Sequence, residues 1–291
     1  MAFSKLQFKP GVNTEVTSYT NEGGWNNCDK VRFRFGFPEK LGGWVKYSLN
    51  TFEGICRSLH AWVTSNGSKL MGVGTHLKFY VEEGTGFNDI TPLRNTTTGS
   101  ATFAATNGST TITVTDSSHG AIVGDYVTFS DAASLGGNIT AAILNIEYEV
   151  VTVPTSNTFT ITASVAANSS DTGNGGGSTI AAYQLNVGIN TVVPGNGWGA
   201  GTWGRGTWGS AATEVTGGGT LRLWSQDNFN DDLIFNLRDG AIYYWDESAG
   251  FQNRAVNLTT LSTTAPSVAR QIMVSDRDNH VIAFGCNPAN T

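Results

Sequence analysis

Short apolar segments with alternating hydrophobic and polar positions, separated by turn-forming residues, make up much of the chain. Residues 110–115 read TTITVT and residues 158–162 read TFTIT, so every second side chain is apolar. A period of two places one face of a strand against a core and leaves the other in solvent. The stretch most compatible with a helical period, residues 138–150, is short and rich in β-favouring positions. We therefore expect an all-β fold with very little helix.

Two segments share the same order of apolar strands and turns. Residues 59–94 and 221–258 each begin with a strand that carries a tryptophan, Trp62 or Trp224, followed by a polar turn and a second strand. A third strand with adjacent aromatic residues then follows in both segments. A third copy begins at Gln271 and stops after its second strand. Antiparallel meanders that repeat every roughly 40–50 residues are typical of propeller blades, so we expect Trp62 and Trp224 to occupy equivalent, buried sites.

This pattern predicts a β-propeller that is incomplete in this chain, because propellers typically use roughly 4–8 blades. A longer form of the chain or another polypeptide would supply the rest. Residues 95–190 interrupt the repeats: they are rich in Thr, Ala, Ser and Gly and contain no Lys or Arg. We expect them to form a small inserted β-barrel or sandwich domain, since loop tips tolerate insertions best. Residues 1–94 would then hold an N-terminal interface segment and the first blade, and residues 191–291 further blades.

The composition of the chain narrows the range of possible functions. Charged residues make up 14% of the chain and the formal net charge is −6. Such a balance argues against a protein that grips nucleic acid over its whole surface, which requires clustered Lys and Arg, but it allows a channel through which DNA slides. Three widely spaced cysteines, Cys28, Cys56 and Cys286, lack zinc-binding spacing and are expected to be reduced thiols. The N-terminus lacks an apolar signal segment, which favours synthesis in a cytoplasm.

The opening of the chain carries the most specific motifs. Residues 9–15 read KPGVNTE, residues 21–25 read NEGGW and residues 28–44 read CDKVRFRFGFPEKLGGW. This block resembles the start of the tail nozzle proteins of short-tailed, podovirus-type bacteriophages, also called tail tubular protein B or packaged-DNA stabilisation proteins. The segments MGVGT at residues 71–75 and DITP at residues 89–92, and the Trp/Gly-rich residues 197–209, extend the resemblance.

The resemblance implies a structural virion protein that is synthesised in the host cytoplasm and resides in the phage tail. Six copies would form a hexameric tube, the distal nozzle, which seals packaged DNA and conducts it during DNA ejection. The partners implied are other copies of the chain, the tail adaptor ring above it, tail fibre or spike proteins, and double-stranded DNA in transient contact. No membrane-spanning segment is expected, because no run approaches the roughly 20 apolar residues needed to cross a bilayer.

Two segments are candidates for interfaces. Lys30, Arg32 and Arg34 alternate with Val31, Phe33 and Phe35, which predicts a strand with a cationic face and an apolar core face. The cationic face is either a solvated surface or a contact to an acidic subunit or to passing DNA. The candidate interface residues are Trp25, Lys30, Arg32, Arg34, Trp44, Trp198, Trp203 and Trp208.

The last three of these tryptophans recur every five residues in a glycine-rich segment. They are suited to packing between blades or to subunit contact, and alternatively to carbohydrate binding through flat aromatic faces.

We expect no catalytic centre, metal or cofactor. Residues 227–232 and 276–279 are rich in Asp and Asn but lack the Gly and the closing Glu of a calcium loop, so turns are the simpler interpretation. The four histidines are isolated, and no nucleophile or phosphate-loop motif occurs. The alternative function is a carbohydrate-binding or glycoside-cleaving propeller that acts in receptor recognition, which would require carboxylates and aromatics at one mouth of the propeller.

Overall fold

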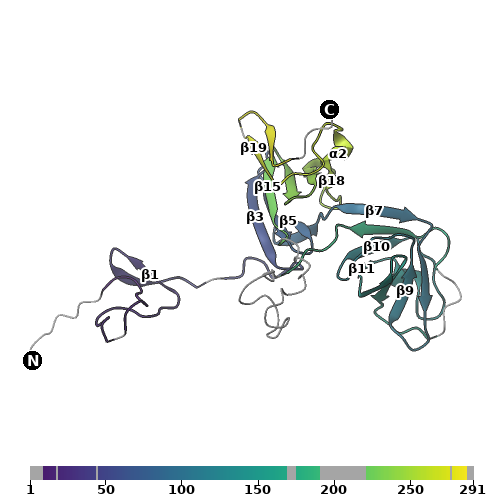
Figure 1. The fold of residues 1–291 in the computed structure, drawn as a ribbon, viewed down its shortest axis with the longest axis horizontal. Coiled ribbons are helices and arrows are strands. Elements are labelled where there is room, and N and C mark those ends of the chain that lie inside the picture. Colours follow the sequence, from purple (N-terminus) through teal and green to yellow (C-terminus); the bar gives the residue numbers. More distant parts are fainter. Residues whose placement is uncertain are drawn as a thin grey trace, which may run out of the picture. The chain divides into compact units, whose positions relative to one another are not determined.

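The computed structural model confirms the all-β fold, and its strands form six antiparallel sheets in the part of the chain that it describes (Figure 1). The described residues are 9–17, 19–43, 45–168, 175–190, 221–275 and 277–286. The chain divides into two compact units, Met1–Leu49 and Asn50–Thr291. Within the described residues, helical structure is limited to three single turns: α1 (Ala141–Leu144), η1 (Glu247–Ala249) and α2 (Leu258–Leu261).

The first unit contains one β-hairpin, made by β1 (Val31–Arg34) and β2 (Phe37–Lys40). Its two-residue loop consists of Phe35 and Gly36, which have φ angles of 51° and 82°. Two positive φ angles in a two-residue loop match the right-handed twist of a hairpin. This explains why a bulky Phe is held there in a conformation that non-glycine residues rarely adopt.

Three blade-like meanders lie in the second unit. The first consists of β3 (Cys56–Val63), β4 (Lys69–Thr75), β5 (Phe79–Glu83) and β6 (Gly86–Asp89). The second consists of β15 (Trp224–Phe229), β16 (Asp232–Leu237), β17 (Ile242–Trp245) and β18 (Val256–Asn257). The third has two strands, β19 (Gln271–Ser275) and β20 (His280–Phe284). In each sheet the spatial order of the strands follows the sequence, as the repeats predicted.

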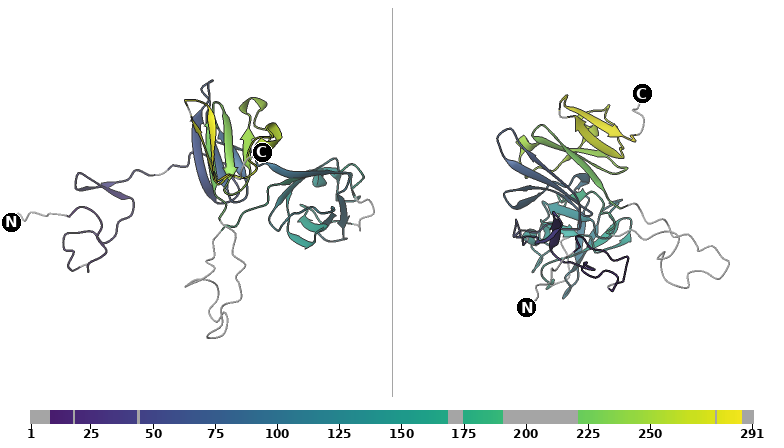
Figure 2. Two further views of the ribbon diagram at one scale, coloured as in Figure 1. Left: turned by 45° about the horizontal axis from the view of Figure 1, so that its top comes forward. Right: turned by 90° about the vertical axis from the view of Figure 1, so that its left-hand side faces the viewer.

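The meanders pack face to face, and their first strands are neighbours: β15 contacts both β3 and β19 (Figure 2). The first two sheets share one apolar core in which Phe79 stacks on Phe235 with ring centroids 3.9 Å apart. The second and third sheets share a smaller core around Ile234 and Ile272. Adjacency of successive first strands is the arrangement of propeller blades around an axis.

Trp62 and Trp224 are both buried in first strands, at 6% and 7% exposure, but they are not equivalent. Trp62 pairs with Leu70 beside the β3–β4 turn, whereas Trp224 pairs with Leu237 at the opposite end of the β15–β16 hairpin. The equivalence prediction is therefore wrong. The β3–β4 loop is longer than the two-residue loop at Asn230 and Asp231, so a match by residue spacing misplaced one tryptophan along its strand.

The Asp-rich segment at residues 227–232 ties sheets together. Asp227 accepts a hydrogen bond from the Val274 backbone N–H at 2.8 Å, and so joins the second sheet to the third. Asp231 accepts one from the Ser65 N–H at 2.7 Å and joins the second sheet to the first. Charge-assisted hydrogen bonds of this type are stronger than neutral ones. These carboxylates are committed to backbone N–H groups of neighbouring meanders.

The residues between the first two meanders form a sandwich of two four-stranded sheets. One sheet has the order β11-β10-β14-β7: β11 (Glu147–Glu149), β10 (Tyr126–Ser130), β14 (Ile180–Gln184), β7 (Leu93–Thr98). The other has the order β12-β13-β9-β8: β12 (Thr152–Thr155), β13 (Thr158–Thr162), β9 (Thr111–Thr115), β8 (Thr102–Ala105). Their inner faces enclose a separate core, in which Phe129 and Phe159 stack with centroids 6.4 Å apart.

The chain leaves and re-enters the blades at one place. β7 and β14 are antiparallel partners, with Leu93 opposite Gln184. Directly after β14, Leu185 donates its N–H to Pro92 O at 3.0 Å and packs against the core of the first two blades. Residues 185–188 therefore bridge the two parts: Gly188 donates its N–H to His76 O of the first meander at 2.8 Å, whereas Val187 donates its N–H to Asp125 Oδ1 of the sandwich at 2.7 Å.

Candidate interface sites

The hairpin of the first unit carries two of the predicted cations on one face. Arg32 and Arg34 lie on β1, alternating with Val31 and Phe33. Lys30 precedes the strand, with a φ angle of 56°. The alternation therefore holds over the strand and ends at the turn, where Phe35 is 88% exposed instead of lying on a core face. The prediction that Phe35 belongs to the core face is wrong, because the chain reverses at this residue.

Each arginine has a nearby partner within the hairpin. Arg32 Nε lies 2.9 Å from Oε2 of Glu39, the residue directly opposite on β2. The hydrogen bond and the charge of Glu39 raise the pKa of Arg32. The guanidinium of Arg34 lies 5.4 Å from the ring centroid of Phe35. Exposed pairs of this kind contribute little to stability because solvent screens them, so the hairpin presents its cations without depending on them for folding.

Trp25 packs against the inner side of the hairpin strand. Its ring meets that of Phe33 edge to face, with centroids 6.0 Å apart, and its backbone forms a bridge with Val12. Asn21, which is buried, donates its side-chain amide to the carbonyls of Asn13 and Trp25. The predicted interface residues Trp44, Trp198, Trp203 and Trp208 lie outside the described residues.

Exposed apolar side chains are frequent in the first unit. Tyr19 is 94% exposed, Val45 is 90% exposed and Leu49 is 92% exposed, and Phe37 and Tyr47 are also largely exposed. Single exposed apolar residues are normal on protein surfaces. A small unit that exposes this many, together with two arginines and an exposed Phe at a hairpin tip, has the composition of a surface that is buried by a partner.

A second site lies where the first meander meets the sandwich. The side chain of Lys78, which precedes β5, is only 5% exposed. Its Nζ lies 3.1 Å from Glu53 Oε2 and 3.4 Å from Asp89 Oδ2, and it is hydrogen-bonded to Glu147 Oε1 of β11. The ammonium also lies 4.1 Å from the ring centroid of Tyr126 on β10. Desolvation lowers the pKa of Lys78, but the surrounding carboxylates outweigh this effect and raise it above its ordinary value.

Arg254 supplies the second cation of this charged junction. Its Nη1 lies 3.2 Å from Asp89 Oδ1, and its Nη2 lies 3.4 Å from Glu147 Oε2. It also donates to Thr91 O at 3.0 Å. Glu147 is thus held by one cation from the first meander and another from the second. Two cations against three carboxylates leave a formal charge of −1, and each of the three carboxylates has a cationic partner, which favours a structural joint.

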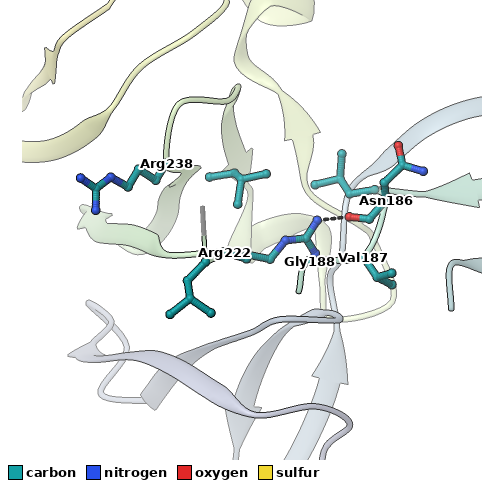
Figure 3. A pocket seen from close by; sticks show the side chains of 8 residues that line it. Asn186, Val187, Gly188, Arg222 and Arg238 are labelled. Carbon is teal, nitrogen blue, oxygen red and sulfur yellow. Dashed lines mark hydrogen bonds between the residues drawn. The ribbon is translucent and has the colours of Figure 1, made fainter. Parts of the chain in front are cut away.

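A cavity of about 350 Å³ lies between residues 185–188 and the second meander (Figure 3). Arg222, which is 6% exposed, extends along it and donates to the carbonyls of His76, Leu77 and Asn186. Burial lowers the pKa of Arg222 to about 10, so it remains protonated at neutral pH. Its guanidinium is fully engaged with backbone carbonyls and anchors the returning chain to the blade.

Other reactive side chains are dispersed. Cys28, Cys56 and Cys286 are free thiols, and burial raises the pKa of Cys56. In the ranges that the structure describes, no group of three or more His, Cys, Asp or Glu residues is arranged to hold a metal ion. Likewise, none of the described helices has the length and apolarity required to cross a membrane.

Sequence reasoning found the strand that carries Arg32 and Arg34 but missed the hairpin turn and the charged junction. Lys78 and Glu147 are 69 residues apart in the chain. Neither residue belongs to a motif, and both look like ordinary solvated charges. One signal was available: Lys78 directly precedes the aromatic pair Phe79-Tyr80 of a predicted strand. That signal indicates burial of the lysine stem but does not identify its partners.

Comparisons with known proteins give little further information. No family model matches the chain, and no curated protein matches it. Among solved structures the chain is similar to one described as phage phi92 endosialidase, with 17% sequence identity and a TM-score of 0.28. The match covers 82% of this chain and 35% of that one, so the chain spans about a third of that protein's length.

Proposed function

We propose that this chain is a structural subunit of a short-tailed phage, located in the distal tail nozzle. The proposal rests on the resemblance of residues 9–44 to the openings of nozzle proteins. In this role several copies, six by that resemblance, surround a channel that seals packaged DNA and conducts it during ejection. A chain with a net charge of −6 suits such a channel, because a negative lumen repels phosphates and offers few sticking points.

The observation that carries the proposal is the exposed surface of the first unit. Its hairpin presents Arg32, Arg34 and Phe35 to solvent, and Tyr19, Val45 and Leu49 are almost fully exposed nearby in sequence. Aromatic and arginine side chains are enriched where proteins associate, and large apolar side chains gain the most from being covered. We infer that this unit is the docking element through which the subunit joins the tail.

A glycoside-cleaving propeller has less support. Hydrolysis of a glycosidic bond requires one carboxyl group that donates a proton and one carboxylate that faces the sugar. The described carboxylates that gather in one place, Glu53, Asp89 and Glu147, are held by Lys78 and Arg254. Such pairing favours a structural role for all three.

Reversal of the hairpin charges tests the docking role. The double variant Arg32→Glu/Arg34→Glu replaces two positive charges by negative ones. If the partner surface is acidic, the variant would meet it with like charges and be repelled. Because Arg32→Glu also faces Glu39, a triple variant with Glu39→Arg restores the cross-strand pair. A matched control, Lys69→Glu/Arg277→Glu, reverses two exposed charges on the blades.

We expect both hairpin variants to fold, as judged by circular dichroism, and to fail to enter tails in a complementation assay with infected cells. The control variant should assemble normally. Normal tail assembly by the triple variant would overturn the docking role of the hairpin. Assembly failure of the control as well would show that overall charge, rather than this surface, is responsible.

A further inference from the structure

One face of the inserted sandwich is an ordered array of threonines. On the β12-β13-β9-β8 sheet, large apolar side chains such as Ile112 and Phe159 point inward and are fully buried. The intervening outward positions line up across the four strands. One row consists of Thr155, Thr158, Thr115 and Thr102. The next row consists of Thr152, Thr160, Thr113 and Ala104. A third row pairs Thr162 with Thr111.

This threonine face carries no charge. None of its four strands contains an Asp, Glu, Lys or Arg, although β8 and β12 are the edges of the sheet. Natural sheets protect their edges with charges, prolines or bulges, and β12 has Pro154 and a register shift in place of a charge. The other sheet of the same sandwich differs, since its edge strand β11 carries Glu147 and Glu149. A high β-propensity of threonine explains its presence in strands, but it does not explain why one face contains almost nothing else.

The array is chemically suited to a hydroxyl-rich, neutral ligand. Each threonine hydroxyl can both donate and accept hydrogen bonds, and its methyl group offers an apolar contact beside the hydroxyl. β-Branching restricts the side-chain torsion, so little rotamer entropy is lost on binding. Hydrogen bonds between neighbouring hydroxyls fix part of the face: the Oγ1 atoms of Thr152 and Thr160 lie 2.7 Å apart, as do those of Thr155 and Thr158.

The spacing favours an extended ligand. Neighbouring strands are about 4.8 Å apart, and residues two apart along a strand are about 6.6 Å apart. The hydroxyls and methyls therefore repeat at regular intervals over the twisted surface of the sheet. A charged polymer would find no counter-charge on it, and an apolar protein surface would have to desolvate a hydroxyl at nearly every position.

We propose that the threonine face binds a neutral polysaccharide, whose sugar rings likewise present hydroxyls beside C–H groups. The inference does not depend on the nozzle proposal, because the face belongs to the sandwich and not to the docking unit. Its ligand class follows from the donor and acceptor pattern and from the lack of charge. An insertion that projects such a face would give a tail subunit contact with glycans at a cell surface.

Affinity electrophoresis of the full chain tests the proposal. Gels that contain dextran, amylose or hydroxyethyl cellulose serve as neutral probes, and alginate serves as a charged comparison. We expect at least one neutral polymer to retard the protein. Thr113→Val/Thr160→Val preserves shape but removes two central hydroxyls, and it should weaken retardation about tenfold, equivalent to about 1.4 kcal/mol. Thr113→Lys/Thr160→Lys should abolish it.

The matched control is Thr96→Lys/Thr98→Lys, which places the same charges at exposed positions on β7 of the opposite sheet. Retardation of this control should equal that of the unchanged protein. The proposal is overturned if no neutral polymer retards the protein, or if the variants at Thr113 and Thr160 are retarded as strongly as the unchanged chain. Concentration-dependent dimerisation that those variants abolish, without retardation by any polymer, would identify a second copy as the occupant instead.

Discussion

Removal of the Lys78 ammonium should weaken the joint between the first meander and the sandwich. Lys78→Met keeps a long apolar side chain over the Tyr126 ring but leaves Glu53, Asp89 and Glu147 without their shared cation. A companion variant, Glu147→Gln, keeps a hydrogen-bonding group on β11 and removes its charge. The two variants together form a double-mutant cycle across the junction.

The expected loss of stability follows from how deeply these ion pairs are buried. Removal of one partner of a buried ion pair typically costs about 3–5 kcal/mol. Here the carboxylates of Asp89 and Glu147 are 22% and 29% exposed and keep Arg254 as a partner. We therefore expect Lys78→Met to lower the free energy of unfolding by about 2–3 kcal/mol, with a coupling energy to Glu147→Gln of about 1 kcal/mol.

Urea unfolding of the full chain, followed by tryptophan fluorescence, measures this loss. Residues 95–190 contain no tryptophan, whereas Trp62, Trp224 and Trp245 are buried in the blades, so the signal reports on the blade side of the joint. Lys69→Met, at an exposed lysine on β4, is the control and should shift stability by less than about 0.5 kcal/mol. If Lys78→Met behaves like this control, the junction does not stabilise the fold and the reasoning is refuted.

Two further predictions concern the blades. Gly74→Ala should destabilise the chain by about 1–3 kcal/mol, because an added Cβ would lie 2.5 Å from Trp224 Cδ1, whereas Gly177→Ala meets no atom within 4 Å and serves as its control in the same urea experiment. Desolvation raises the pKa of both Tyr80 and Tyr243 to about 12, so the neutral phenols stabilise the fold fully below pH about 10 and lose this contribution as the pH rises toward 12. Phenolate absorbance should therefore develop at a higher pH in the folded protein than in the urea-unfolded protein. Titration curves that coincide would contradict the burial of these two phenols.

The alternation of apolar and polar residues was sufficient to predict the strands and the order of the meanders. β13 was predicted with its bounds, and β9 to within one residue. Residues 148–153 read YEVVTV and are divided between β11 and β12, which lie in different sheets. The adjacent Val150 and Val151 interrupt the alternation, and a period of two does not reveal where the chain crosses from one layer to the other.

At the candidate sites, too, features set by neighbouring residues could be predicted from the sequence, and contacts between distant segments could not. The positions of Arg32 and Arg34 on one strand face followed from local alternation. The turn at Phe35 did not, since a hairpin loop with a bulky residue at positive φ is uncommon. The contacts of Lys78 join four separate segments of the chain, and such contacts are set by tertiary packing that no local pattern encodes.

Deletion of the sandwich gives the strictest test of how the insertion relates to the blades. Asn95 and Tyr183 face each other on β7 and β14, so replacement of residues 96–182 by Asn-Gly would close a two-residue hairpin there. The blade core uses no residue between Ile90 and Leu185, and it should therefore remain folded.

The deletion would remove Glu147 and Tyr126 from the surroundings of Lys78 but leave Glu53 and Asp89. We expect the tryptophan-monitored stability to fall by no more than about 2 kcal/mol, and Lys78→Met to cost about 1 kcal/mol less in the deletion background than in the full chain. Loss of cooperative blade unfolding would show that the two cores depend on each other. An unchanged cost of Lys78→Met would show that its stabilising partners lie wholly within the blades, because the deletion removes the contacts of Lys78 with Glu147 and Tyr126.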